Sequence, residues 1–314
     1  MTRCSDLPIP ASWCIVVYRP QMTEVELYHL RAKIWHIDGH SITTLEDAQG
    51  FLDSVGFCLM YPIASLPLVP TFIGAYAGSE ERLPDGKHAF ADSRSQPALE
   101  LMVRLLRERR AYEINFSPDT PMIVSAPLFP FFYALVGDRN PKAVPKTKAQ
   151  GAKVSPLGVK VFEMIQKNGP LSKPRLQELI SREFTTAALD RALNELWSIL
   201  KITRVDYRES DGAQWDPLYR WSPEVVAEGL KLSVPEALSA LLGKYLEAVV
   251  AAGQDDIEQL FSYLVSRSKI RDAVHALLAA RELDLITVGS KSCIELAPAL
   301  EPHPPHRRRG DSIG

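Results

Sequence analysis

Residues 185–208 read TTAALDRALNELWSILKITRVDYR and contain a change of hydrophobic period that decides the fold. In the first half, apolar side chains recur at offsets 0, 3, 4, 7 and 11 from Leu189, which is the spacing of one face of an amphipathic helix. After Leu200, the apolar side chains of Val205 and Tyr207 alternate with polar ones, as in a short strand. The stretch therefore predicts a helix that is followed directly by a strand.

Two helical patterns precede this stretch, and a second strand-like run follows it. The Ser-Pro pair at 155–156 predicts a capped helix start, and Asn-Gly-Pro at 168–170 predicts the end of that helix. A turn at 209–212 joins the first strand to a second run at 217–221. Three helices followed by a hairpin are typical of a winged helix-turn-helix, so we predict such a module at residues 154–223.

The predicted module lies in the basic part of the chain, whose formal net charge over 314 residues is −2. Residues 139–221 contain 15 Lys and Arg against 9 Asp and Glu. Residues 1–138 contain 11 against 16, and residues 222–314 contain 10 against 13. Clustered cations attract polyanions, because neutralising phosphates releases counterions. Charge alone favours an evenly solvated surface over a nucleic-acid partner, and the winged-helix pattern within the basic segment shifts the balance towards nucleic acid.

A helix-turn-helix module places the N-terminal residues of its recognition helix at base edges in the major groove, while its wing reaches the phosphate backbone. We therefore predict double-stranded DNA as the partner. The alternative is that Asp190 and Arg191 only solvate a helix face. The residues predicted to contact DNA are Thr185, Thr186, Arg191 and Asn194 from the helix, and Arg208 and Gln214 from the wing.

The same order of elements is predicted again near the C-terminus, without similarity of residues. Residues 236–252 predict a helix, Asp255 and Ser266 open two more, and residues 284–296 predict a hairpin. We therefore predict a second winged helix at 224–298. This copy is acidic, so it either contacts DNA, with Arg267 and Lys269 in the exposed set, or serves as a packing or dimer module.

The remaining segments complete the predicted organisation. Residues 1–138 predict an N-terminal helical, winged-helix-like domain, and the Pro-, Lys- and Gly-rich residues 139–153 predict a linker. Residues 299–314 predict a disordered tail. The predicted fold class is mainly α with short β-hairpins, built from tandem winged helix-turn-helix modules.

Composition and motifs exclude several classes of protein. Apolar residues make up 46% and charged residues 24% of the chain, and no run reaches the ~20 apolar residues of a membrane helix. The four cysteines are scattered, which predicts reduced thiols and a cytoplasmic location. No P-loop, GxGxxG, GxSxG or HExxH motif is present, so we predict neither a cofactor nor a metal.

Several stretches, in this order along the chain, are similar to motifs of a known family. Residues 46–62 (EDAQGFLDSVGFCLMYP) resemble the signature FIDEVGFCLLFP, and residues 127–135 (PLFPFFYAL) resemble PYFYAL. Residues 189–196 (LDRALNEL) resemble FDRALAEL, and a Tyr-Arg-Trp-x-Pro ending follows at 219–223. Together these stretches resemble the AlkZ-related (YcaQ-like) branch of the winged-helix DNA glycosylases, over about residues 30–296.

The resemblance implies tandem winged helices that embrace DNA and excise alkylated or crosslinked bases without a metal. The signature of the family is Gln-x-Gln or Gln-x-Asp, and the nearest match by position is Phe51-Leu52-Asp53, with Phe in place of Gln. Asp53 would then be the catalytic carboxylate, because such a group stabilises positive charge that develops on the sugar. The alternatives are a surface role for Asp53, a winged-helix transcriptional regulator without enzymatic activity, and a protein-binding scaffold.

Overall fold

The computed structural model describes residues 21–117, 120–151, 154–180 and 184–298. Within these residues the chain combines helices with small sheets. The prediction of a helical protein with short β-structure is confirmed to this extent. Cys4, Cys14 and the predicted tail at 299–314 lie outside the described residues, whereas Cys58 and Cys293 are buried free thiols. No helix in the described part of the chain is long and apolar enough to cross a membrane.

One order of elements occurs three times in the described residues: helix, strand, two helices, two strands. The first module has α2 (Leu45–Val55), β2 (Phe57–Leu59), α3 (Phe72–Ala77), α4 (Ser95–Arg107), β3 (Ala111–Ser117) and β4 (Thr120–Ser125). The second has α6 (Pro156–Asn168), β5 (Leu171–Ser172), α7 (Lys173–Ile180), α8 (Thr186–Trp197), β6 (Ile202–Arg208) and β7 (Gly212–Pro217). The third has α11 (Val234–Val249), β8 (Ala251–Ala252), α12 (Gln254–Phe261), α13 (Arg267–Ala279), β9 (Leu283–Val288) and β10 (Lys291–Leu296).

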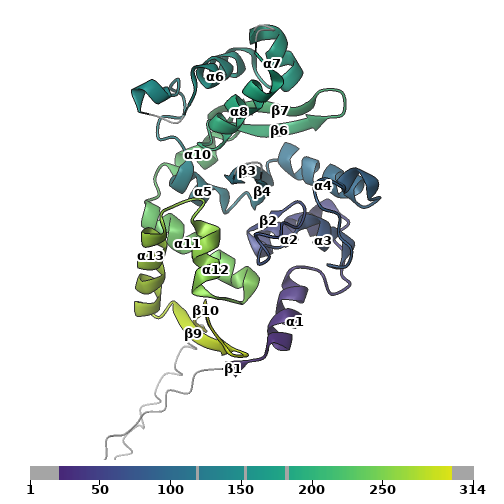
Figure 1. Cartoon of the computed structure of the whole chain (residues 1–314), viewed down its shortest axis with the longest axis vertical. Coiled ribbons are helices and arrows are strands. Elements are labelled where there is room, and N and C mark those ends of the chain that lie inside the picture. Colours follow the sequence, from purple (N-terminus) through teal and green to yellow (C-terminus); the bar gives the residue numbers. More distant parts are fainter. Residues whose placement is uncertain (1–20, 118–119, 152–153, 181–183, 299–314) are drawn as a thin grey trace, which may run out of the picture.

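The three sheets of the described residues share one strand order. In each module the last strand pairs with both other strands, giving β2-β4-β3, β5-β7-β6 and β8-β10-β9. A short N-terminal strand, β1 (Gln21–Met22), adds to the third sheet in parallel with β9. The second module lies at one end of the long axis, and the sheet of the third lies at the other (Figure 1). The connecting helical segments are α1 (Glu24–Ile34), η1 (Ala89–Ala91), α5 (Phe129–Val136), η2 (Lys148–Gln150), α9 (Leu218–Trp221) and α10 (Pro223–Gly229).

Local sequence signals explain where the helices begin and end. Thr44 and Asp47 form a reciprocal capping box at the start of α2, and Ser155 accepts a hydrogen bond at the start of α6. Gly56 ends α2 with φ +77°, and a Cβ atom there would lie 2.5 Å from Lys244 Cγ. Glycine suits this position because it adopts the positive φ of the turn and because it has no Cβ to collide with α11.

The predicted position of the second strand in the basic module was wrong. The strand was predicted at 217–221, but β7 ends at Pro217 and the following residues form α9. Proline has no N–H to continue the ladder, and the Asp216–Arg220 ion pair has the i,i+4 spacing that favours a helical turn. The alternation before the proline, in which Trp215 is buried, was the signal that was missed.

The first and third modules share one hydrophobic core. Helix α11 packs against α5 and α2, and the ring of Phe57 is stacked on that of Tyr245, with centroids 6.1 Å apart. Helix α1 adds polar contacts, because Arg31 donates hydrogen bonds to the carbonyls of Val249 and Ala251. Residues of the predicted N-terminal and C-terminal domains therefore share a hydrophobic core, whereas the second module has a core of its own.

Lys201 ties the second module to the chain that precedes it. Its side chain is fully buried at the start of β6, and Nζ donates to the carbonyls of Asn140, at 2.5 Å, and Ala143, at 2.6 Å. The carboxylate of Asp138 completes the shell at 3.1 Å. The first part of the predicted linker is therefore packed around this ammonium group, because a buried cation must be surrounded by acceptors.

Replacing Lys201 with Met tests this anchor. The apolar side chain leaves several acceptors unpaired, so we expect Lys201→Met to lower the free energy of unfolding by about 2–4 kcal/mol. Urea unfolding followed by circular dichroism measures the loss. Lys142→Met, at an exposed lysine of the same segment, should stay within about 0.5 kcal/mol of the wild type. Equal stability of the two variants would show that the anchor contributes nothing.

Candidate nucleic-acid interface and carboxylate site

The N-terminal half of α8 presents the helix residues that the sequence predicts for DNA contact. Thr185 caps the helix by accepting a hydrogen bond from the Ala188 amide at 3.2 Å. The exposed hydroxyl of Thr186 accepts from Gln177 at 3.0 Å. Arg191 is exposed, and Asn194 lies one turn later, half-buried. The four residues therefore follow the exposed side of one helix end.

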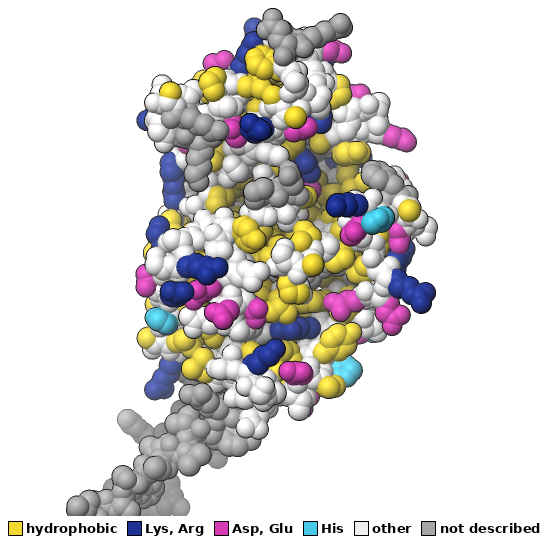
Figure 2. Space-filling model, in the orientation of Figure 1, with side chains coloured by type: hydrophobic (Ala, Val, Ile, Leu, Met, Phe, Trp, Pro, Cys, Tyr) yellow, Lys and Arg dark blue, Asp and Glu magenta, His cyan; other side chains and the backbone are white. Residues whose placement is uncertain are grey.

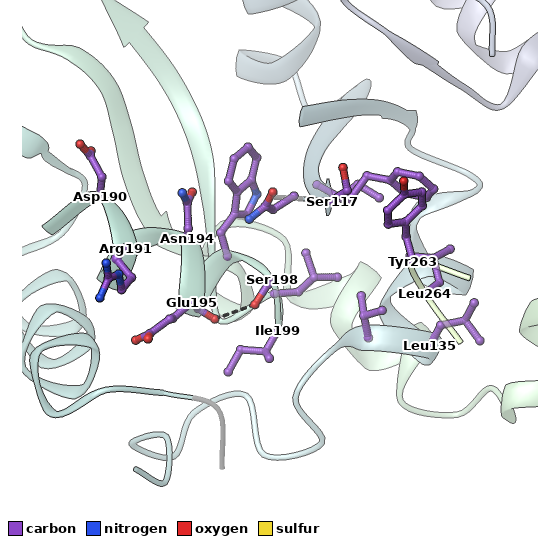
Figure 3. A pocket seen from close by; sticks show the side chains of 16 residues that line it. Ser117, Leu135, Asp190, Arg191, Asn194, Glu195, Ser198, Ile199, Tyr263 and Leu264 are labelled. Carbon is purple, nitrogen blue, oxygen red and sulfur yellow. Dashed lines mark hydrogen bonds between the residues drawn. The ribbon is translucent and has the colours of Figure 1, made fainter. Parts of the chain in front are cut away.

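A pocket of about 780 Å³ opens beside this helix, and we call it the α8 pocket. Figure 3 shows Asp190, Arg191 and Asn194 on one side of it, and Ser117 and Tyr263 on the other. Its walls come from all three modules and from α5, so it exists only in the assembled chain. The lining residues are Ile114, Asn115, Phe116, Ser117, Leu135, Val136, Asp190, Arg191, Asn194, Glu195, Trp197, Ser198, Ile199, Leu200, Tyr263 and Leu264.

The two residues predicted at the wing have different surroundings. Arg208 is exposed near the tip of the β6–β7 hairpin, 3.7 Å from the carboxylate of Asp206. Gln214 is only 4% exposed, and its Nε2 donates to the carbonyl of Gly212 at 3.2 Å. Its neighbours Trp215 and Asp216 are buried as well, so both faces of β7 are covered at this position. A buried amide offers no surface to a DNA backbone, so we correct the prediction for Gln214.

Arg107 of α4 is a contact at the wing that the sequence did not reveal. Its guanidinium pairs with Asp206 at 2.5 Å and donates to the carbonyl of Tyr207 at 3.2 Å. The arginine therefore braces the hairpin against the first module. No sequence signal pairs these residues, because they lie about a hundred positions apart.

The two residues predicted in the third module are exposed on the first turn of α13. Arg267 and Lys269 face solvent, while Arg271, one turn later, makes two hydrogen bonds of 2.8 Å to the carboxylate of Glu258. The part of the α8 pocket that the third module contributes ends at Leu264, three residues before Arg267. Arg267 and Lys269 therefore follow the pocket-lining residues Tyr263 and Leu264 closely in the sequence.

Lys and Arg do not form one dense patch on the face drawn in Figure 2. Hydrophobic side chains gather over the middle of that face, and the cations are spread singly with Asp and Glu between them (Figure 2). A contact with DNA there would depend on individual side chains rather than on a broad basic field.

Asp53 lies on α2 in a second, smaller pocket of about 400 Å³, which we call the Asp53 pocket. Gln49, one turn earlier, donates to Asp53 Oδ2 at 3.4 Å, and Arg110 donates to Gln49 Oε1 at 3.0 Å. Asp53 Oδ1 is buried and has no hydrogen-bond partner among the described residues. Burial raises the pKa of Asp53, against the opposing effects of Gln49 and Lys244.

The sequence singled out Phe51 and Asp53 but missed Gln49. Phe51 is 1% exposed and packs edge-on against Phe72, so it belongs to the core. Gln49 precedes Asp53 by four residues, which places the two side chains on one helix face. That i,i+4 spacing was available in the sequence, whereas the contact with Arg110 depends on the tertiary structure.

The structure separates the predicted carboxylate from the predicted DNA-contacting helix. The β3–β4 hairpin lies between them: Ala111 pairs with Ser125 at one end, and Ser117 pairs with Thr120 at the other. Ser125 lines the Asp53 pocket, and Ser117 lines the α8 pocket. The Asp53 pocket is also lined by Phe131 of α5, and the α8 pocket by Leu135 and Val136 of the same helix, so the two pockets are separate but have neighbouring walls.

Comparisons with known proteins identify the family. A family model described as DNA glycosylase AlkZ-like matches residues 91–311, more than two thirds of the chain. The chain belongs to the AlkZ-like DNA glycosylase family. The match contains α8 and its pocket, but it begins after Asp53, so the role of Asp53 stays a prediction. No curated protein matches the chain.

A solved structure shows the same fold. The chain is similar to Streptomyces sahachiroi DNA glycosylase AlkZ, with a TM-score of 0.52 and 13% sequence identity. The similarity covers 85% of this chain and 69% of that one. The resemblance to the AlkZ-related family that the motifs indicated is thereby confirmed. Among the described residues, no group of three His, Cys, Asp or Glu side chains lies close enough to hold a metal ion.

The raised pKa of Asp53 predicts a pH dependence of stability. The folded state binds more protons than the unfolded state between the ordinary value of 3.8 and the raised value, so Asp53 destabilises the fold as pH rises through that window. Asparagine does not titrate, so Asp53→Asn should gain stability relative to the wild type as pH rises above about 4. Urea midpoints over a pH series measure this, with Asp272→Asn, at an exposed aspartate of α13, as the matched control. A difference that is constant with pH would contradict the assignment.

Proposed function

We propose that this member of the AlkZ-like family is a double-stranded-DNA-binding protein of DNA repair, related to glycosylases that excise alkylated or crosslinked bases. The observation that carries the proposal is the exposed N-terminal half of α8, whose Arg191 and Asn194 border a pocket of about 780 Å³. A helix end of this kind fits the major groove, and a pocket beside it gives room for a base. A cytoplasmic location is part of the proposal.

The proposal interprets the three modules as winged helix-turn-helix units. The order helix, strand, two helices, two strands, with the last strand between the other two, supports this interpretation in each of them. Helix α8 is then the recognition helix of the second unit, and the β6–β7 hairpin with Arg208 is its wing. Helix α13, with Arg267 and Lys269, has the corresponding position in the third unit.

Asp53 is the catalytic carboxylate in this proposal. Cleavage of an N-glycosidic bond develops positive charge on the sugar, and a carboxylate beneath the sugar stabilises that charge or orients a water molecule. The Arg110–Gln49 contact orients Gln49 towards one carboxylate oxygen, and the other oxygen has no partner among the described residues. Alkylated bases are good leaving groups because they carry positive charge, so one carboxylate suffices for them.

A second candidate function is DNA binding without catalysis, as in a winged-helix transcriptional regulator. Two observations favour it: Phe51 replaces the Gln of the family signature and is buried in the core, and Asp53 lines a different pocket from the one beside α8. Base release separates the two functions, whereas the absence of duplex binding would favour a protein-binding scaffold.

Arg191→Ala tests the DNA contact. We expect the variant to bind duplex DNA about tenfold more weakly than the wild type, with a shallower dependence of affinity on salt, because one charged contact is lost. Fluorescence anisotropy at several salt concentrations measures both quantities. Arg82→Ala, at an exposed arginine of the first module, is the matched control and should stay within about twofold. Equal losses of affinity in the two variants would show that Arg191 of α8 does not contact the DNA.

Asp53→Asn tests the chemistry. Alkylated duplex DNA should release bases with the wild-type protein, scored as alkali-labile abasic sites, and release should fall by at least about 100-fold in the variant. Asp272→Asn should retain the wild-type rate. If wild type and variant bind DNA equally and neither releases bases, the chain is a DNA-binding relative without the glycosylase reaction.

A further inference from the structure

The α8 pocket has an aromatic ring at its rim with one side open. Tyr263 follows α12 and is 44% exposed. Its ring lies against that of Phe116, with centroids 5.3 Å apart and planes inclined by 52°. Phe116 is buried in β3, so it holds the tyrosine in place. A ring that is held in place by a buried neighbour and is partly exposed offers a surface on which another planar group can stack.

An unpaired acceptor lies in the same pocket. Asn115 lines the pocket, and its Oδ1 is buried without a hydrogen-bond partner among the described residues. The β3–β4 register shifts between Asn115 and Ser117, which is the irregularity of a β-bulge. Bulges turn side chains away from the ordinary alternation of a strand and occur beside functional sites. A buried carbonyl oxygen without a donor costs free energy, and a ligand with an N–H group would satisfy it.

The remaining walls restrict the class of ligand. The buried ring of Trp197 and the partly buried Leu135 and Val136 supply apolar surface, while Arg191 is exposed beside the opening. A volume of about 780 Å³ lies within the ~300–1,000 Å³ of ligand pockets. A planar ring with an N–H donor, attached to an anionic backbone that remains outside near Arg191, fits all of these features.

We propose that the α8 pocket receives a nucleobase extruded from duplex DNA. Tyr263 stacks on the base, and Asn115 Oδ1 accepts a hydrogen bond from its exocyclic amino group. The inference rests on the proposed DNA binding, but it does not require Asp53 or base release. It assigns the pocket to bases that present an N–H donor, such as the amino group of adenine, because the orphaned atom is an acceptor.

Binding to unpaired bases tests the stacking. The probe is a duplex with one adenine opposite an abasic site, because an unpaired base costs little to extrude, and the reference is the fully paired duplex. The wild type should bind the probe about tenfold more tightly than the reference. Tyr263→Ala should bring this ratio close to one, while Tyr263→Phe keeps it. Tyr28→Ala, at an exposed tyrosine of α1, is the matched control and should keep the wild-type ratio.

A second probe tests the acceptor. Replacing the unpaired adenine with purine, which has the same rings without the amino group, should weaken wild-type binding several-fold, and Asn115→Leu should lose that discrimination. Affinity for the paired duplex reports whether each variant is folded.

The outcomes separate the inference from the proposed function. If the wild type binds paired duplex without preferring the unpaired base, or if Tyr263→Ala keeps the preference, the pocket assignment is wrong and DNA binding stands. If the wild type binds no duplex, both are overturned.

Discussion

Arg204 holds the second module against the first, and the shape of the α8 pocket depends on this contact. Its guanidinium lies 4.2 Å from the ring centre of Trp197 and 5.0 Å from that of Trp215, and it faces the buried carboxylate of Glu113 at 3.5 Å. Trp197 also donates a hydrogen bond to the carbonyl of Glu113 at 3.1 Å. The two neighbouring rings and the carboxylate offset part of the cost of removing the guanidinium from water. The contact places α8 beside β3, and the pocket lies between them.

The junction at Arg204 lies between two of the three repeated modules. Each copy packs its own helices on a small sheet, but the first and third copies also merge their cores through α11. The second copy has its own core and is joined to the rest through Leu200, which packs in the shared core, and through polar contacts at Lys201 and Arg204. Interfaces of this kind set the position of one module relative to another while each keeps its own core.

The separation of the two pockets bears directly on function. A glycosylase that used Asp53 would have to bring the sugar to the pocket lined by Asp53 and Ser125, whereas α8 and Tyr263 line the other pocket. Binding at the α8 pocket and catalysis at Asp53 are therefore independent proposals for this member of the AlkZ-like family. Phe51 is buried in the hydrophobic core beneath α2 and lines neither pocket.

The sequence by itself determined the local elements of this protein, together with its resemblance to the family. Hydrophobic period and caps located α8, α11 and α13, because these signals depend on residues within a few positions of each other. The repeat in the first module, the burial of Gln214, the shared core and both pockets were decided only by the tertiary structure. Contacts such as Trp197 with Glu113 join residues 84 positions apart, and no local pattern encodes which distant side chains will meet.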